Sequence, residues 1–243
     1  MEMNKDALAY LVGLGKAGVC EINGQFFSDH TLTRVPSVIP SPDKITFTSL
    51  DSIVKLVKRE AEGLMSHENI PVFVRVDSPR KVSVFSGCAE EFKRHYFYEA
   101  TCDVPDFYEG FRPHETAIIE LQSRYADGEG RDYLLNLLSS INRESSVSTN
   151  DNGVSQTVQA RTGVHLLQTV QVKPRVALRP YRTFLEVEQP ESQFLLRLNE
   201  KGEVGLFEAD GGMWKLAAKK NVSTYLENAL ADMISAGSVV VME

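Results

Sequence analysis

The sequence predicts a mixed α+β fold: N-terminal hairpins with helices, then a helical pair, then a mainly antiparallel β-sheet with a C-terminal helix packed on it. Three observations support this prediction. Hydrophobic residues make up 42% and charged residues 24% of the 243 residues, as in ordinary globular domains. Short stretches alternate apolar and polar residues around turn-forming sequences, which is typical of strands joined by hairpins. Longer stretches repeat apolar residues at intervals of three and four, which is typical of helices that bury one face.

The first half of the chain contains hairpins and helices. Asn23-Gly24 accepts the positive φ angles of a type I′ turn, so residues 19–22 and 25–28 are expected to pair. Asp77-Ser78-Pro79-Arg80 is a second turn sequence, between alternating strands at 72–76 and 82–86. Further strands are expected at 45–49 and 96–100, and helices at 6–14, 50–64, 113–125 and 131–141. The last two helices are close in sequence, which predicts an antiparallel helical pair.

The second half is richer in polar and β-branched residues. Asp151-Asn152-Gly153 predicts the tight turn of a long hairpin. Further strands are expected at 164–172, 176–188, 194–199, 204–208 and 238–242. Asn221 is a suitable N-cap for a helix that runs to Ala236 and is stopped by Gly237. We therefore place a boundary near Arg143, between an N-terminal α+β region (1–143) and a C-terminal β-rich region with a terminal helix (144–243).

Charge and hydropathy restrict the class of partner. The net charge of −7 and the isoelectric point near 5.4 disfavour an attraction of the whole surface to DNA or to an anionic membrane, but they are compatible with a local basic patch. No stretch approaches the roughly 20 apolar residues that span a bilayer, so no membrane partner is expected. The N-terminal residues lack the features of a signal peptide, and three scattered cysteines do not suggest a disulfide framework. We expect a cytoplasmic protein.

Four acidic residues form the densest carboxylate group in the sequence. Glu186 and Glu188 lie two residues apart on one predicted strand, and Glu208 and Asp210 lie two apart at the end of another, so each pair shares a strand face. If the two strands are neighbours, the four carboxylates suit a hard cation such as Mg²⁺. The alternative is a solvated strand face followed by a turn at Gly211-Gly212.

Basic and aromatic residues alternate in two places. Lys93 and Arg94 precede an aromatic run that begins at Tyr96. The second set consists of Lys173, Arg175, Arg179, Tyr181 and Arg182. Such side chains neutralise phosphates and stack on unpaired bases, so all seven are candidate nucleic-acid contacts. The alternative is a sheet with one charged face and one buried aromatic face.

Signatures of the familiar enzyme classes are absent from the sequence. There is no Gly-x-Ser-x-Gly elbow, Walker loop or dinucleotide-binding fingerprint, and the five histidines do not have the spacing of zinc ligands. We therefore expect no catalytic residue and no cofactor.

Trp214 follows a glycine pair and is expected to pack in the core at the start of a strand, or else to form the wall of a ligand pocket.

Several segments resemble a group of uncharacterised bacteriophage and prophage proteins. They are Leu178-Arg179-Pro180-Tyr181-Arg182-Thr183-Phe184-Leu185-Glu186-Val187-Glu188-Gln189-Pro190, Leu206 to Gly212, Asp151 to Gln156 and Ala7 to Val12. The likeness spans most of the chain, and the order of the segments is similar to that of the YfdQ-like prophage family. The resemblance implies a phage early-region protein, encoded near recombination and replication genes, that acts in the cytoplasm of the infected bacterial host. It implies no catalytic residue.

The leading hypothesis is a phage-encoded accessory protein that acts by binding, either to a host defence or nuclease component or within the phage DNA-processing machinery. The expected partner is a host or phage protein, and nucleic acid and a second copy of the chain are further candidates. Two alternatives stay open. One is a nucleic-acid-binding protein of phage recombination or replication, and the other is a divalent-metal-dependent enzyme that uses the acidic group.

Overall fold

The computed structural model describes residues 5–15, 18–22, 25–28, 43–64, 71–88, 94–140, 146–151, 156–162 and 165–243. The chain divides into two compact units, Met1–Ser41 and Pro42–Glu243. The first unit contains helix α1 (Lys5–Leu14) and the antiparallel strands β1 (Val19–Ile22) and β2 (Gln25–Ser28). The hairpin predicted there is confirmed, and its turn lies outside the described residues.

The second unit has the predicted mixed α+β class. Its helices are α2 (Leu50–Leu64), α3 (His114–Arg124), α4 (Glu129–Ser140), α5 (Trp214–Ala229) and α6 (Ala231–Ser235). Its strands are β3 (Ile45–Phe47), β4 (Val72–Ser78), β5 (Lys81–Phe85), β6 (Tyr96–Thr101), β7 (Gly110–Arg112), β8 (Ser146–Asp151), β9 (Gln156–Thr162), β10 (His165–Val172), β11 (Arg175–Leu178), β12 (Ser192–Leu198), β13 (Val204–Glu208) and β14 (Val239–Met242). Most strand pairs are antiparallel, because short turns join most neighbours.

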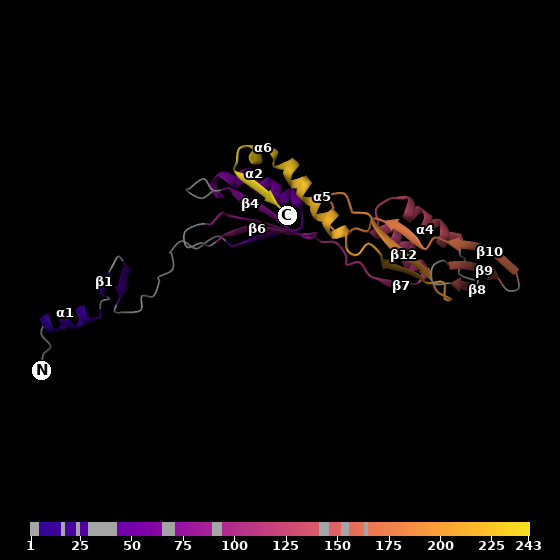
Figure 1. The fold of residues 1–243 in the computed structure, drawn as a ribbon, viewed down its shortest axis with the longest axis horizontal. Coiled ribbons are helices and arrows are strands. Elements are labelled where there is room, and N and C mark those ends of the chain that lie inside the picture. Colours follow the sequence, from indigo (N-terminus) through magenta and orange to yellow (C-terminus); the bar gives the residue numbers. More distant parts are fainter. Residues whose placement is uncertain are drawn as a thin grey trace. The chain divides into compact units, whose positions relative to one another are not determined.

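A five-stranded sheet has the order β14-β4-β5-β6-β3. The three central strands form an antiparallel meander, while the edge strands β14 and β3 run parallel to β4 and β6. Such parallel pairs need long crossovers, and α2 and α5 belong to the two crossovers. Helices α2, α5 and α6 lie on one face of this sheet, where valines of β4 and β5 pack against leucines of α2 and α5 (Figure 1).

A four-stranded antiparallel sheet has the order β11-β12-β13-β7. Helices α3 and α4, the predicted helical pair, contribute Leu121, Leu134 and Leu138 to a core shared with Phe194 and Leu196 of β12. A separate three-stranded antiparallel sheet has the order β10-β9-β8 and contains the predicted long hairpin. The boundary predicted near Arg143 falls at 141–145, which lie outside the described residues.

The C-terminal helix differs from the prediction in its start and in its location. α5 begins at Trp214 and not at Asn221, because the Asp210 carboxylate accepts hydrogen bonds from the backbone N–H groups of Gly212 and Trp214 and so organises the first turn. Asn221 lies within the helix. The helix packs on β4 and β14, and not on the sheet of the second half. The periodicity of a helix gives its buried face but does not say which sheet covers that face.

The strand predicted at 176–188 ends at Leu178. Pro180 cannot donate a hydrogen bond to a neighbouring strand, and the residues on either side of it pair with the end of α3 and the segment after it. Arg179 O accepts from Ala126 N, and Tyr181 N donates to Arg124 O. Farther on, the Gln189 side chain accepts from Arg182 N, at 2.9 Å. These bonds fold residues 179–191 into an irregular connection.

None of the helices in the described ranges is long and apolar enough to cross a bilayer.

Candidate nucleic-acid interface

The five-stranded sheet carries its helices on one face only, within the part of the chain that is described. On β4, Val72, Val74 and Val76 are buried against the helices, so the residues between them face the other way. We call this second side the open face. Its residues are Phe73, Arg75 and Asp77 of β4, Lys81, Ser83 and Phe85 of β5, Tyr96 and Glu99 of β6, and the adjoining Lys44 and Arg94.

Three aromatic rings form a row across the open face. Phe73 stacks on Phe85 with 5.7 Å between ring centroids and an interplanar angle of 13°, and Phe85 lies 5.1 Å from Tyr96. An irregularity in the β5–β6 register at Val84/Phe85 places Tyr96 on the open face although Tyr98, two residues later, is buried on the inner face. Tyr96 is 43% exposed. The row therefore ends in a ring that is open to a ligand.

Two arginines cover the inner part of this row. The guanidinium carbon of Arg94 lies 5.4 Å and 5.5 Å from the ring centroids of Phe73 and Phe85, and that of Arg75 lies 5.3 Å from Phe85. Arg75 also pairs with Asp77 at 2.5 Å, and the hydrogen bond that Arg75 donates to Asp77 raises the pKa of this guanidinium. Arg94 is exposed. Its guanidinium plane is thus a second surface on which a flat group can stack.

A polar basin of about 450 Å³ adjoins the aromatic row and includes Arg75 and Tyr96 in its lining. In it, Lys44 and Lys81 reach the carboxylate of Glu99 at 2.6 Å and 3.0 Å. These bonds, led by that from Lys44, hold the pKa of Glu99 below its ordinary value. One carboxylate cannot neutralise two ammonium groups, so the basin keeps a positive excess.

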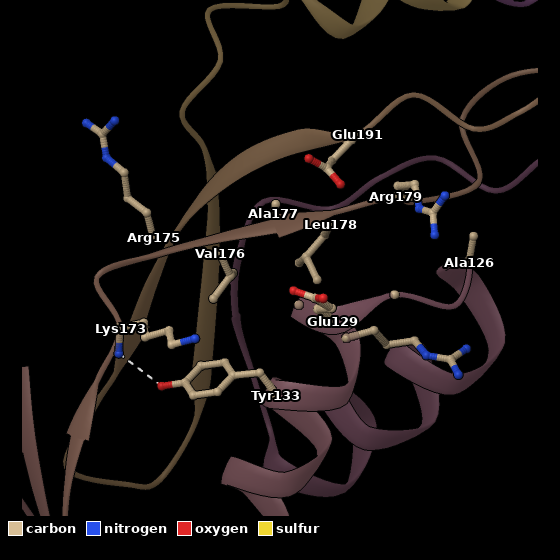
Figure 2. Close-up of a pocket in the computed structure, with 13 residues that line it drawn as sticks. Ala126, Glu129, Tyr133, Lys173, Arg175, Val176, Ala177, Leu178, Arg179 and Glu191 are labelled. Carbon is tan, nitrogen blue, oxygen red and sulfur yellow. Dashed lines mark hydrogen bonds between the residues drawn. The ribbon is translucent and has the colours of Figure 1, made fainter.

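The second predicted basic set does not form a single surface. Lys173, Arg175 and Arg179 are among the residues that line a cleft of about 490 Å³ between β11 and α4. The side chain of Arg175, however, points to the opposite side of β11 from Val176 and Leu178 (Figure 2). Within it, Lys173 Nζ lies 4.7 Å from the Tyr133 ring, and Arg179 pairs with Glu188 at 3.4 Å. The acids Glu129 and Glu191 also line the cleft, so its charge is mixed.

Arg182 and Tyr181, the other two members of that set, lie elsewhere. Arg182 is 1% exposed, so this conformation does not present it to a ligand. Tyr181 lines a small pocket of about 70 Å³ beside Phe107 and Pro180. Of the first set, Arg94 is on the open face and Lys93 lies outside the described residues. The structure therefore disperses the six candidates that it describes.

The four candidate acids make different structural contacts. Glu186 Oε1 accepts from Leu50 N, at the start of α2, at 2.8 Å. Glu188 pairs with Arg179, Glu208 pairs with the buried Arg182, and Asp210 organises the turn before α5. Among the described residues, no three His, Cys, Asp or Glu side chains are grouped so that they can hold a metal. Neither Glu186 nor Glu188 is in a strand, so the shared strand face that suggested the site does not exist.

Trp214 begins a helix, not the strand that we predicted. Its ring is covered by Arg182, whose guanidinium carbon lies 4.1 Å from the ring centroid. Its Nε1 is buried without a hydrogen-bond partner among the described residues. The tryptophan thus packs on a charged group inside the protein.

The ionisation of Asp210 makes the stability of the folded protein depend on pH in the acid range. Burial by itself raises the pKa of Asp210, but hydrogen bonds from the Ser192 hydroxyl and from Gly212 and Trp214, with the charge of Arg182, outweigh it and lower the pKa below the ordinary 3.8. A lowered folded-state pKa contributes stability above the unfolded value, and this stability is lost as the pH falls through the folded value. We expect Asp210→Asn to flatten the loss of stability that occurs as the pH falls below about 4, measured by urea unfolding. Asp132→Asn, at an exposed site on α4, is the matched control; an equal flattening there contradicts the assignment.

Sequence reasoning missed most of the open face. It identified Arg94 and the neighbouring aromatic run, but not Phe73, Arg75, Lys81 or Phe85. The available signal was the alternation itself, because each of these residues adjoins a buried valine of a predicted strand.

No family model, curated protein or solved structure matches this chain. A functional assignment therefore rests on the chemistry of the open face.

Proposed function

We propose that this chain is a phage-encoded accessory protein that binds single-stranded nucleic acid on the open face. The observation that carries the proposal is the row Phe73, Phe85 and Tyr96, with Arg75 and Arg94 over its inner part. The row lies on a sheet face that carries no helix in the part of the chain that is described. Unpaired bases stack on aromatic rings and on guanidinium planes, and the surrounding cations neutralise phosphates. The exposed Tyr96 ring and the exposed Arg94 guanidinium are the two stacking surfaces.

The basin next to the row is the phosphate-binding part of this site. Lys44 and Lys81 are held in place by Glu99, so they lose little side-chain freedom when a phosphate arrives. Among the described residues, the open face has four cations, Lys44, Arg75, Lys81 and Arg94, against two acids, Asp77 and Glu99. This local excess is positive although the chain as a whole has a net charge of −7. A single strand fits such a site better than a duplex, because its bases can leave the stack and lie on the rings.

The cellular role follows from the resemblance to phage early-region proteins. A binder of single strands encoded near recombination and replication genes would act in phage DNA processing. The acids give no support to a metal-dependent enzyme, because each of the four has a protein partner of its own. Experiment has to distinguish nucleic acid from a host or phage protein as the ligand of the open face.

The test is binding of a labelled oligothymidylate, about 10 nucleotides long, followed by fluorescence anisotropy at low and at moderate salt. We expect binding that weakens as salt rises, and a loss of affinity of at least about 25-fold in the double variant Arg94→Ala with Tyr96→Ala, because each stacking contact contributes about 1–3 kcal/mol. The matched control is Arg59→Ala with Tyr10→Ala. It removes an arginine side chain from α2, which lies on the helix-covered face of the five-stranded sheet, and a tyrosine side chain from α1.

Two outcomes contradict the proposal. One is the absence of binding by the unaltered chain in low salt. The other is binding that the control and the open-face variant weaken equally, because the contact then lies elsewhere on the protein.

A further inference from the structure

The four-stranded sheet also has a face directed away from its helices. The register opposes Arg175 with Leu195, Leu195 with Phe207, and Gly205 with both Arg197 and Phe111. Directly opposed residues point to the same side of a sheet, so these side chains share one face. Val176, Phe194 and Val204 point to the other side and are buried against α3 and α4. We call the first side the second face and define it by Arg175, Leu195, Arg197, Gly205, Phe207 and Phe111.

On this face, Gly205 lies beneath the rings of Phe207 and Phe111. A Cβ at residue 205 would lie 2.8 Å from the Phe207 ring and 2.9 Å from the Phe111 ring, so both rings extend over the glycine. The two rings meet edge to face, with 5.7 Å between their centroids. Phe111 remains 41% exposed. An exposed ring that is fixed by a neighbouring ring is a ready stacking surface.

Cationic side chains lie on the same face. Arg175 is exposed. Figure 2 places its side chain on the opposite side of β11 from Val176 and Leu178, which is the side of the second face. Arg197, opposite Gly205, brings a second guanidinium. The face thus repeats the pairing of exposed aromatic and arginine that marks the open face.

We infer that the second face is a further contact for single-stranded nucleic acid, in which a base stacks on Phe111 and Arg175 meets a phosphate. This inference rests on the proposed function and deepens it: a strand long enough to reach both faces has two separate contacts on one chain. Linked contacts raise the affinity for a long strand without changing the affinity for a short one.

The experiment compares two labelled oligothymidylates, of about 10 and about 40 nucleotides, on the full chain. Phe111→Ala with Arg175→Ala is expected to weaken binding of the long strand at least about fivefold and to leave the short strand unchanged. Ile119→Ala with Arg59→Ala is the matched control, because it removes an exposed apolar side chain from α3 and an exposed arginine from α2. Arg175→Glu alone, at an exposed side chain, guards against a folding defect and is expected to weaken long-strand binding too.

The two proposals fail in different ways. If the open-face variant weakens both strands and the second-face variants weaken neither, the further inference is wrong and the proposed function stands. An equal loss for both lengths also overturns it, because the second face is then not a separate contact. If the unaltered chain binds neither strand, both proposals are wrong.

Discussion

Replacing Arg182 with alanine is expected to lower the free energy of unfolding by about 3–5 kcal/mol, the usual cost of breaking a buried ion pair. The Arg182 guanidinium donates to the Glu208 carboxylate in a partly buried contact and to the Ser192 hydroxyl in a buried one. Burial lowers the pKa of Arg182, opposed by Glu208, but a guanidinium still keeps its proton. Alanine therefore leaves the Glu208 carboxylate without its counter-charge and leaves the Trp214 ring without its cover.

Arg182 also lies where the five-stranded sheet and the four-stranded sheet meet. Its carbonyl accepts from Arg80 Nε at 3.1 Å, and Thr183 donates to Pro79 O, both in the β4–β5 turn. Two residues on, Phe184 joins the core of the five-stranded sheet, while the Arg182 side chain packs near Phe194 of the other core. The effect of Arg182→Ala should therefore extend to both sheets.

Urea unfolding checks this prediction, with Arg179→Ala as the control. Arg179 belongs to the same segment but is one-third exposed and pairs with Glu188 at 3.4 Å, so its loss should cost less than about 1 kcal/mol. Arg182→Met keeps part of the side-chain volume and should fall between the two variants. A loss for Arg182→Ala no larger than that for Arg179→Ala would show that the buried charge does not hold this junction.

Gly130→Ala is expected to cost about 3 kcal/mol, although alanine favours helices over glycine by about 1 kcal/mol elsewhere. A Cβ at residue 130 would lie 1.9 Å from the carbonyl oxygen of Ala177, which is an impossible contact with backbone. Gly130 is in the first turn of α4 and Ala177 is in β11, so the helix must move away from the strand. That movement opens the leucine core beneath α4.

Thermal unfolding measures this cost, and Gly128→Ala is the matched control. A Cβ at residue 128 would meet only the end of the Arg179 side chain, at 3.3 Å, which can move. We expect a change of less than about 1 kcal/mol there. Equal melting temperatures for Gly130→Ala and the unaltered chain would contradict the close approach of α4 to β11.

Local patterns predicted most of the elements. The valine alternation of β4 and β5 and the spacing of α3 and α4 are encoded within one element or one turn, so the sequence was sufficient for them. Two features depend on distant residues and were missed. α5 packs on β4 because the chain returns to that sheet, and the segment after Leu178 is folded by bonds to Ala126 and Gln189.

The candidate sites show the same limit. Arg94 was identified because aromatic residues follow it in sequence, but its ring partners Phe73 and Phe85 belong to β4 and β5, and not to that aromatic run. The four acids looked like one group because of their spacing, yet each is used by a different neighbour, such as Leu50 for Glu186. Residues two apart in sequence share a face only where they lie in a strand.

Photo-crosslinking of the full chain to a single strand that contains a photoreactive thymidine analogue tests the central claim most directly. Mass spectrometry of the digested complex identifies the peptide that carries the nucleotide. We predict adducts on the peptide containing Tyr96, reduced by unlabelled strand and by added salt. Adducts confined to α2 or α5, on the opposite side of the five-stranded sheet, would contradict the assignment of the open face.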